Sequence, residues 1–194
     1  ITASGRPLGQ IASQPAYIVA AGVAMVSYGI MVLVMTATPV AMLGCGFSVQ
    51  DSSWVIQWHA LAMYVPSFFT GAVITRIGAS RTSIIGMVML VLAAVAGLLG
   101  IHFENFAVGL VLLGIGWNFG YIGGTTLLTN TYEPLERSKA QGLNDLLVFG
   151  TTTITSLSAG ALMAGAGWNA VNWAVIPLAA IGGALIVWLW RRPK

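Results

Sequence analysis

Hydrophobic residues occupy six long blocks of this chain, separated by short polar links. The blocks cover approximately residues 15–43, 53–74, 84–100, 106–129, 140–165 and 173–190. A helix needs about 20 apolar residues to cross the hydrocarbon core of a bilayer, within a range of roughly 17 to 25. Because lipid cannot satisfy exposed backbone polar groups, each block is expected to be helical. The pattern predicts an all-α membrane protein with six transmembrane helices, an interfacial arm at 1–14 and a tail at 191–194.

Polar side chains divide these six blocks into two kinds. The third and sixth blocks are almost pure hydrocarbon, whereas the first, second, fourth and fifth carry polar residues at helical spacing. We therefore expect the third and sixth helices to face lipid and the other four to enclose a shared aqueous chamber. Two groups of three, each ending in an apolar helix, indicate a three-plus-three repeat.

Charges are few, and their placement predicts an orientation. Hydrophobic residues make up 57% of the chain and charged residues 7%, whereas soluble domains carry about a quarter charged residues. All eight Lys and Arg residues lie in the arm, the links at 75–81 and 130–139, and the tail. The three alternate links hold none. The positive-inside rule then predicts a multi-pass protein of the cytoplasmic (inner) membrane with both termini cytoplasmic. Since topology accounts for the net charge of +3, a nucleic-acid partner is not expected.

Several classes of site lack their usual sequence signals. Cys45 is the single cysteine, and no Cys/His cluster has the spacing of metal ligands, so neither a disulfide, a metal site nor a cofactor is expected. No signal peptide pattern is present, and the start at Ile1 suggests a piece of a longer protein. An enzyme is not expected either, because His59 and Asp145 enter from opposite membrane sides without a catalytic motif.

The fourth block combines a packing face with a polar face. Its glycines recur every four residues and would let a neighbouring helix approach closely: Gly116, Gly120 and Gly124. A polar set falls near the opposite side: Asn118, Tyr121, Thr125 and Thr129. Asn118 is either a residue that hydrogen-bonds the solute or a brace between helices. Trp117, its neighbour, is a candidate contact for the solute.

Asp145 is the sharpest candidate for a binding role. It lies about eight residues into the fifth block, roughly 12 Å from its end at 1.5 Å per residue. An ionised carboxylate within a membrane helix costs about 2.5 to 3.5 kcal/mol on insertion scales. Asp145 is thus either a proton or cation site, or a structural hydrogen-bonding group for a loop amide or Arg137. Asn144 and Thr152 lie on the two polar faces of the same block and join the candidate set.

His59 in the second block has two interpretations. Its side chain titrates near neutral pH, which would suit a proton site within the membrane. A lone imidazole between Trp58 and Met63 is also typical of a packed, hydrogen-bonded residue.

Four segments carry a resemblance to a known family. Residues 71–81, GAVITRIGASR, resemble the loop motif of the major facilitator superfamily at Gly71, Arg76, Gly78 and Arg81. Thr75 stands where that motif usually has Asp, and Ser80 replaces a basic residue. Residues 134–142, PLERSKAQG, resemble the equivalent cytoplasmic loop after the fourth helix. GWNFGYIGGTT at 116–126 and QGLND at 141–145 resemble a group of bacterial transporters in that superfamily, so the resemblance covers nearly the whole chain.

This resemblance implies the C-terminal six-helix half of a twelve-helix major facilitator fold. The implied function is secondary active transport of a small solute by alternating access, with coupling to an ion, the proton. The implied partners are the lipid bilayer and an N-terminal six-helix half, or a second six-helix chain. First and fourth helices would line the cavity, and second and fifth would form its walls. The alternative is a non-transporting scaffold or accessory subunit that reuses the fold.

The same resemblance implies a gate made of charges in the cytoplasmic turns. Arg76 is expected to clasp Glu133 or Glu136 when the cytoplasmic side closes, with Arg81 and Arg137 in the same set. Solvated turn charges without a function are the alternative, because exposed ion pairs contribute only about 0 to 1 kcal/mol.

Overall fold

The computed structural model describes residues 5–192, and within that range every regular element is a helix. The elements are α1 (Leu8–Ala12), α2 (Pro15–Gly44), α3 (Val49–Tyr64), α4 (Ser67–Ile77), α5 (Ala79–Leu98), α6 (Phe103–Thr129), the 3-10 helix η1 (Pro134–Glu136) and α7 (Arg137–Trp190). The all-α membrane fold predicted from the sequence is confirmed. The first four residues of the predicted arm, and Pro193 and Lys194 in the predicted tail, lie outside the described residues.

Three of the predicted helices differ in form from the prediction. The second block is a bent pair, because α3 and α4 meet at 41° around Pro66, whose ring and missing N–H interrupt the helical ladder. This pair begins at Val49 rather than near residue 53, because Ser48 and Asp51 form a capping box.

The fifth and sixth blocks are joined without a separate loop. Gly167, at φ 74° and ψ −172°, breaks α7 into two arms.

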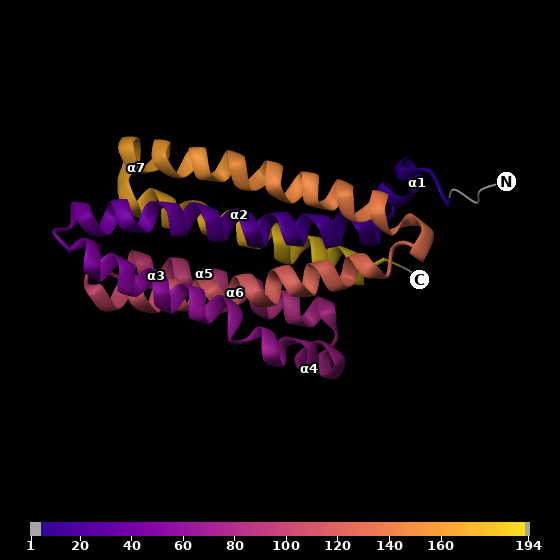
Figure 1. The fold of residues 1–194 in the computed structure, drawn as a ribbon, viewed down its shortest axis with the longest axis horizontal. Coiled ribbons are helices and arrows are strands. Elements are labelled where there is room, and N and C mark those ends of the chain that lie inside the picture. Colours follow the sequence, from indigo (N-terminus) through magenta and orange to yellow (C-terminus); the bar gives the residue numbers. More distant parts are fainter. Residues whose placement is uncertain (1–4, 193–194) are drawn as a thin grey trace.

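α2 lies between the two parts of the bundle (Figure 1). The first arm of α7, drawn in orange, runs along one side of α2, and α6 lies on the other side. The chain reverses at the left of the picture, and the second arm of α7 returns in yellow. α1, the end of α7, the α6–α7 turn and the α4–α5 turn lie toward the other end. The elements that carry the cations are therefore gathered at one end of the bundle.

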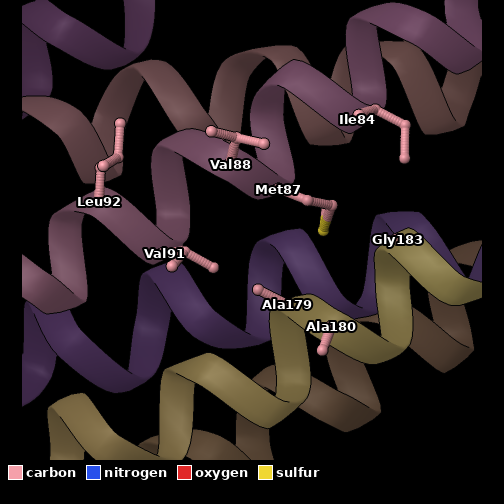
Figure 2. A pocket seen from close by; sticks show the side chains of 8 residues that line it. All are labelled: Ile84, Met87, Val88, Val91, Leu92, Ala179, Ala180 and Gly183. Atoms are coloured by element: carbon pink, nitrogen blue, oxygen red, sulfur yellow. The ribbon is translucent and has the colours of Figure 1, made fainter.

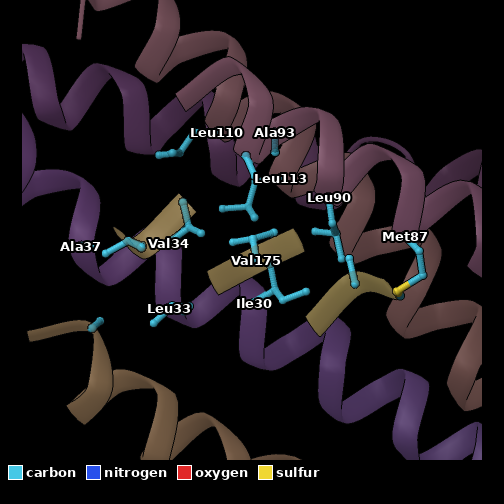
Figure 3. Close-up of a cluster of buried hydrophobic side chains, with 14 of the residues drawn as sticks. Ile30, Leu33, Val34, Ala37, Met87, Leu90, Ala93, Leu110, Leu113 and Val175 are labelled. Carbon is cyan, nitrogen blue, oxygen red and sulfur yellow. The ribbon is translucent and has the colours of Figure 1, made fainter. Parts of the chain in front are cut away.

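The main core is formed by four elements: α2, α5, α6 and the second arm of α7 (Figure 3). Its labelled side chains are Ile30, Leu33, Val34, Ala37, Met87, Leu90, Ala93, Leu110, Leu113 and Val175. All of them are aliphatic or thioether side chains, so this part of the core is held by close packing.

The glycine ladder of α6 packs as the sequence predicts. A Cβ atom added to Gly86 of α5 would lie 2.4 Å from the Gly120 backbone nitrogen and 2.8 Å from the Gly116 carbonyl oxygen. On the neighbouring side, a Cβ on Gly124 would lie 3.1 Å from the Ala20 carbonyl oxygen of α2. The glycines therefore bring α6 to backbone contact with α5 and close to α2.

α5 between Ile84 and Leu92 and the second arm of α7 between Ala179 and Gly183 face each other with apolar residues. Between them runs an open groove of about 280 Å³ (Figure 2). Its lining is aliphatic or thioether throughout: Ile84, Met87, Val88, Val91, Leu92, Ala179, Ala180 and Gly183. A face of this kind suits contact with lipid tails, as expected for the third and sixth helices.

Candidate functional site

Five aromatic rings from four helices form one continuous layer, which we call the aromatic surface. Its members are Tyr28 of α2, Tyr64 of α3, Trp117 and Tyr121 of α6, and Phe149 of the first arm of α7. Tyr28 is central, because its ring lies edge-on to three others, with centroid distances of 5.5 Å to Trp117, 5.1 Å to Tyr121 and 6.2 Å to Phe149. Tyr64 extends the layer from Trp117 at 6.4 Å.

Trp117 and Tyr121 form the base of this layer. They are four residues apart on α6, so they occupy the same face one turn apart, and their rings stack at 5.4 Å with an interplanar angle of 12°. Trp117 is 8% exposed, whereas Tyr64 and Phe149 at the margins are 63% and 56% exposed. Trp117 at the base of the layer is therefore buried, whereas Tyr64 and Phe149 at its margins are exposed.

The indole of Trp117 has an unpaired polar atom. Its Nε1–H is buried and has no hydrogen-bond partner within the part of the chain that the structure describes. The surrounding side chains include Met31 and Met63, which offer only weak acceptors. Since buried polar groups are nearly always paired in proteins, this N–H is a donor available to a bound molecule or water.

Asp145 lies on the same side of the bundle as this aromatic surface. Its carboxylate is exposed on α7 and close enough to Tyr121 and Tyr17 to interact with them electrostatically. Among the described residues it forms no ion pair with Arg137. Asn144 beside it is buried. Its Nδ2 lies 3.4 Å from the Asp145 carboxylate, and its Oδ1 has no hydrogen-bond partner in residues 5–192.

Thr125 lies one helical turn after Tyr121, and Thr152 lies one helical turn after Phe149. The Thr125 hydroxyl donates to its own helix, 3.0 Å from the Tyr121 carbonyl oxygen, and the Thr152 hydroxyl lies 2.9 Å from the Phe149 carbonyl oxygen. Both side chains are half-buried. Each hydroxyl oxygen retains a lone pair that can accept a hydrogen bond.

Asn118 is not part of this site. Its side chain is fully buried, and its Nδ2 donates to the Met63 carbonyl oxygen at 2.7 Å and contacts Ser67 Oγ at 2.6 Å. Its Oδ1 accepts a hydrogen bond from the Thr70 hydroxyl. Both N–H groups of the Asn118 amide are therefore hydrogen-bonded to residues on the two sides of the bend between α3 and α4. These bonds support the brace between helices rather than contact with a solute.

His59 also lies apart from the aromatic surface. It is 1% exposed, and its Nδ1 lies 2.8 Å from the Leu110 carbonyl oxygen, so Nδ1 carries the proton that this bond needs. Nε2 is buried without a partner among the described residues. The packed interpretation of His59 fits these contacts, because the ring joins α3 to α6.

The clasp of Arg76 with Glu133 or Glu136, expected for a closed cytoplasmic side, stays a prediction, because Arg76 makes no ion pair among the described residues. Glu136 instead pairs with Arg6, whose Nη2 lies 2.7 Å and whose Nε lies 2.9 Å from the carboxylate oxygens. Hydrogen bonds from the Arg6 side chain, followed by the bond from the Glu133 backbone N–H, lower the pKa of Glu136 in the turn before α7 to about 2. Arg76, Arg81 and Arg137 are exposed and make no ion pair within residues 5–192.

The local backbone fits this ion pair closely. Gly5 has φ 60°, and a Cβ added to it would lie 2.7 Å from Glu136 Cγ. Arg6 Nη2 also donates to the Thr131 carbonyl oxygen at 3.0 Å, and Gln14 Nε2 donates to the same oxygen at 2.9 Å. The segment before α2 is therefore fixed to the α6–α7 turn by several bonds at once.

Comparisons with known proteins point to one family. Residues 19–194 match the family model of the Major Facilitator Superfamily. The chain is similar to the riboflavin transporter RfnT of Brucella anthropi, with 46% identity over 92% of this chain and 45% of the relative. It is 34% identical to the uncharacterized MFS-type transporter YdeG of Bacillus subtilis over 91% of this chain and 41% of that protein.

A more distant relative is the drug efflux pump JefA of Mycobacterium tuberculosis. It is 26% identical over 72% of this chain and 27% of the pump. The chain thus spans less than half the length of each of these three relatives.

Proposed function

The chain belongs to the major facilitator superfamily, and we propose that it forms the C-terminal half of a secondary transporter that works by alternating access. Transport, rather than catalysis, is the function of this family and of its named relatives. The proposed half comprises six spans: α2, the α3–α4 pair, α5, α6 and the two arms of α7. Its coverage of 45% of the riboflavin transporter supports this assignment. Because the cations gather at one end, we place that end and both termini on the cytoplasmic side of the inner membrane.

The proposal rests mainly on one observation: the aromatic rings and Asp145 lie on different helices or helix arms from the apolar groove. The aromatic surface and Asp145 lie on α2, α3, α6 and the first arm of α7, whereas α5 and the second arm present an apolar groove. A half-transporter needs this division, because one side faces an aqueous cavity and the other faces lipid.

We propose that the partner half covers the large apolar side chains left bare on α3, α4 and the first arm of α7. They include Trp54, Trp58, Phe68, Phe69, Leu146, Ile154 and Leu157. The partner is either the N-terminal half of the same protein or a second six-helix chain. Stoichiometric binding to unrelated subunits, without solute uptake, would favour the scaffold alternative instead.

Riboflavin is the first solute to test, because the relative with 46% identity over 92% of this chain is named a riboflavin transporter. The experiment measures uptake of labelled riboflavin into vesicles that contain both halves, with and without an imposed proton gradient. Accumulation against a riboflavin gradient, driven by protons, is expected. Equal entry into vesicles with and without the protein would contradict the proposal.

Asp145 is the proposed coupling group. Its exposed carboxylate is positioned to bind a proton from the cavity, and its interaction with Tyr121 links it to the aromatic surface. The charges of the cytoplasmic turns have a different proposed role. The Arg6–Glu136 pair ties the segment before α2 to the α6–α7 turn, so that these two parts move together during the transport cycle.

A further inference from the structure

We propose that the aromatic surface recognises a planar conjugated ring that carries a hydrogen-bond acceptor, and that Trp117 determines this specificity. The inference rests on the proposed transport function and names the substrate class of the same site. Trp117 contributes in two ways: its ring anchors the layer on which a solute ring packs, and its Nε1–H pairs with the solute's acceptor.

The first support is the composition of the layer. Each of the four helices proposed to line the cavity contributes at least one ring, and no charged side chain belongs to the layer. Aromatic rings favour edge-to-face and offset-stacked contacts at centroid distances of about 4.5 to 7 Å. A solute with a flat π-system extends this pattern. An acyclic polyol cannot, because it has no π-system to pack against the rings.

The second support is the gradient of exposure across the layer. Tyr64 and Phe149 at the margins present bare ring faces, while Tyr28 between them is only half-exposed. These two marginal rings come from α3 and α7, which flank α2 and α6. A flat ring that enters from the cavity therefore meets Tyr64 or Phe149 first and packs toward Tyr28 and Trp117.

The third support is independent of ring geometry. Trp117 Nε1 is a buried donor that has no acceptor among the described residues. A purely hydrocarbon ring would leave this N–H unpaired, whereas a ring carbonyl oxygen or imine nitrogen would satisfy it. Sites built to hydrogen-bond a solute discriminate strongly against analogues that lack the matching group.

The test compares two substitutions at Trp117 in the complete transporter. Trp117→Phe keeps an aromatic ring and removes the donor, whereas Trp117→Leu removes both. Binding of riboflavin and of lumichrome, its bare ring system, is measured by titration of the purified protein. Ribitol, which matches the non-aromatic part of riboflavin, serves as the competitor without a ring. The control is Trp173→Phe, because Trp173 is exposed on the second arm of α7 and outside the layer.

We expect lumichrome to compete with riboflavin and ribitol to fail. Trp117→Phe should weaken binding of both ring compounds by at least about tenfold, Trp117→Leu should weaken it further, and Trp173→Phe should leave it unchanged. Tyr28→Leu supplies a second variant that tests stacking without touching the donor, in case a Trp117 variant fails to fold.

Two outcomes would overturn the inference. One is unchanged ring binding in both Trp117→Phe and Tyr28→Leu. The other is a wild-type transporter that binds neither ring compound. If such a protein still accumulates a different solute down a proton gradient, ring recognition fails while the proposed transport function stands. If it accumulates nothing, both fail.

Discussion

Replacement of Gly86 by alanine should separate α5 from α6. The added Cβ would lie 2.4 Å from Gly120 N, 2.8 Å from Gly116 O and 2.9 Å from Gly120 Cα. All three atoms belong to the backbone, so no rotamer change can relieve the contact. Bringing the shortest of these distances to an ordinary contact of about 3.5 Å requires the helices to move apart by about 1 Å.

The size of the effect follows from two opposing terms. Overpacking a well-packed interior costs about 1 to 3 kcal/mol, and a backbone clash belongs at the upper end of that range. Alanine in a helix interior regains about 0.5 to 1 kcal/mol relative to glycine. The net destabilisation is therefore about 2 kcal/mol. For a chain of this size, each kcal/mol shifts the melting temperature by roughly 2 to 4 °C, so a decrease of about 4 to 8 °C is expected.

The assay is thermal unfolding of the purified transporter, followed by tryptophan fluorescence. Gly183→Ala is the matched control, because it lies in the packed contact between α5 and α7 but its added Cβ would be 4.0 Å from Ile84 Cδ1. This variant should melt at or slightly above the wild-type temperature. If Gly86→Ala melts as high as the control, α5 and α6 are not in backbone contact and the packing argument is refuted.

Three further predictions concern the polar groups. Asp145→Asn should abolish proton-driven accumulation in vesicles while leaving solute binding measurable; accumulation at the wild-type rate would exclude the coupling role. Glu136 has its pKa lowered to about 2 in the folded protein, so its stabilisation is present above the usual pKa of 4.5 and is lost as pH falls toward 2. Glu136→Gln should therefore flatten the acid-side loss of stability in unfolding curves, whereas Glu104→Gln, an exposed control, should not. Asn118→Leu should destabilise the fold by about 1 to 3 kcal/mol, because it leaves buried partners on α3 and α4 unpaired; a melting temperature equal to that of wild type would exclude the brace.

Periodicity within the sequence was sufficient to predict the long helices and the glycine packing face of α6. Trp117 and Tyr121 are four positions apart, a spacing that puts both rings on one face of α6. Periodicity did not predict that Tyr28, Tyr64 and Phe149 join them. Contacts between rings on different helices depend on how each helix is rotated about its axis, and a single helical pattern does not define that rotation.

The bend at Pro66 and the Arg6–Glu136 ion pair were not predicted, each for its own reason. Pro66 lies inside an unbroken apolar block, so composition alone did not show that the span bends there. The pairing of Arg6 with Glu136 joins residues 130 apart in sequence, and several acids and bases compete for it on charge alone. The nearest signal in the sequence was the glycine before Arg6. The structure explains it, because the positive φ of Gly5 and its contact with Glu136 leave no room for a side chain.

Solvent accessibility of two opposite faces tests the central claim most directly. Single cysteines are introduced at Thr152 and at Leu92 in a Cys45→Ser background of the complete transporter, and membranes are treated with a water-soluble thiol reagent that does not cross lipid. We predict labelling at position 152, beside the aromatic surface, and none at position 92 in the apolar groove. Labelling at 92 with protection at 152 would contradict the assignment of the aqueous and lipid-facing sides.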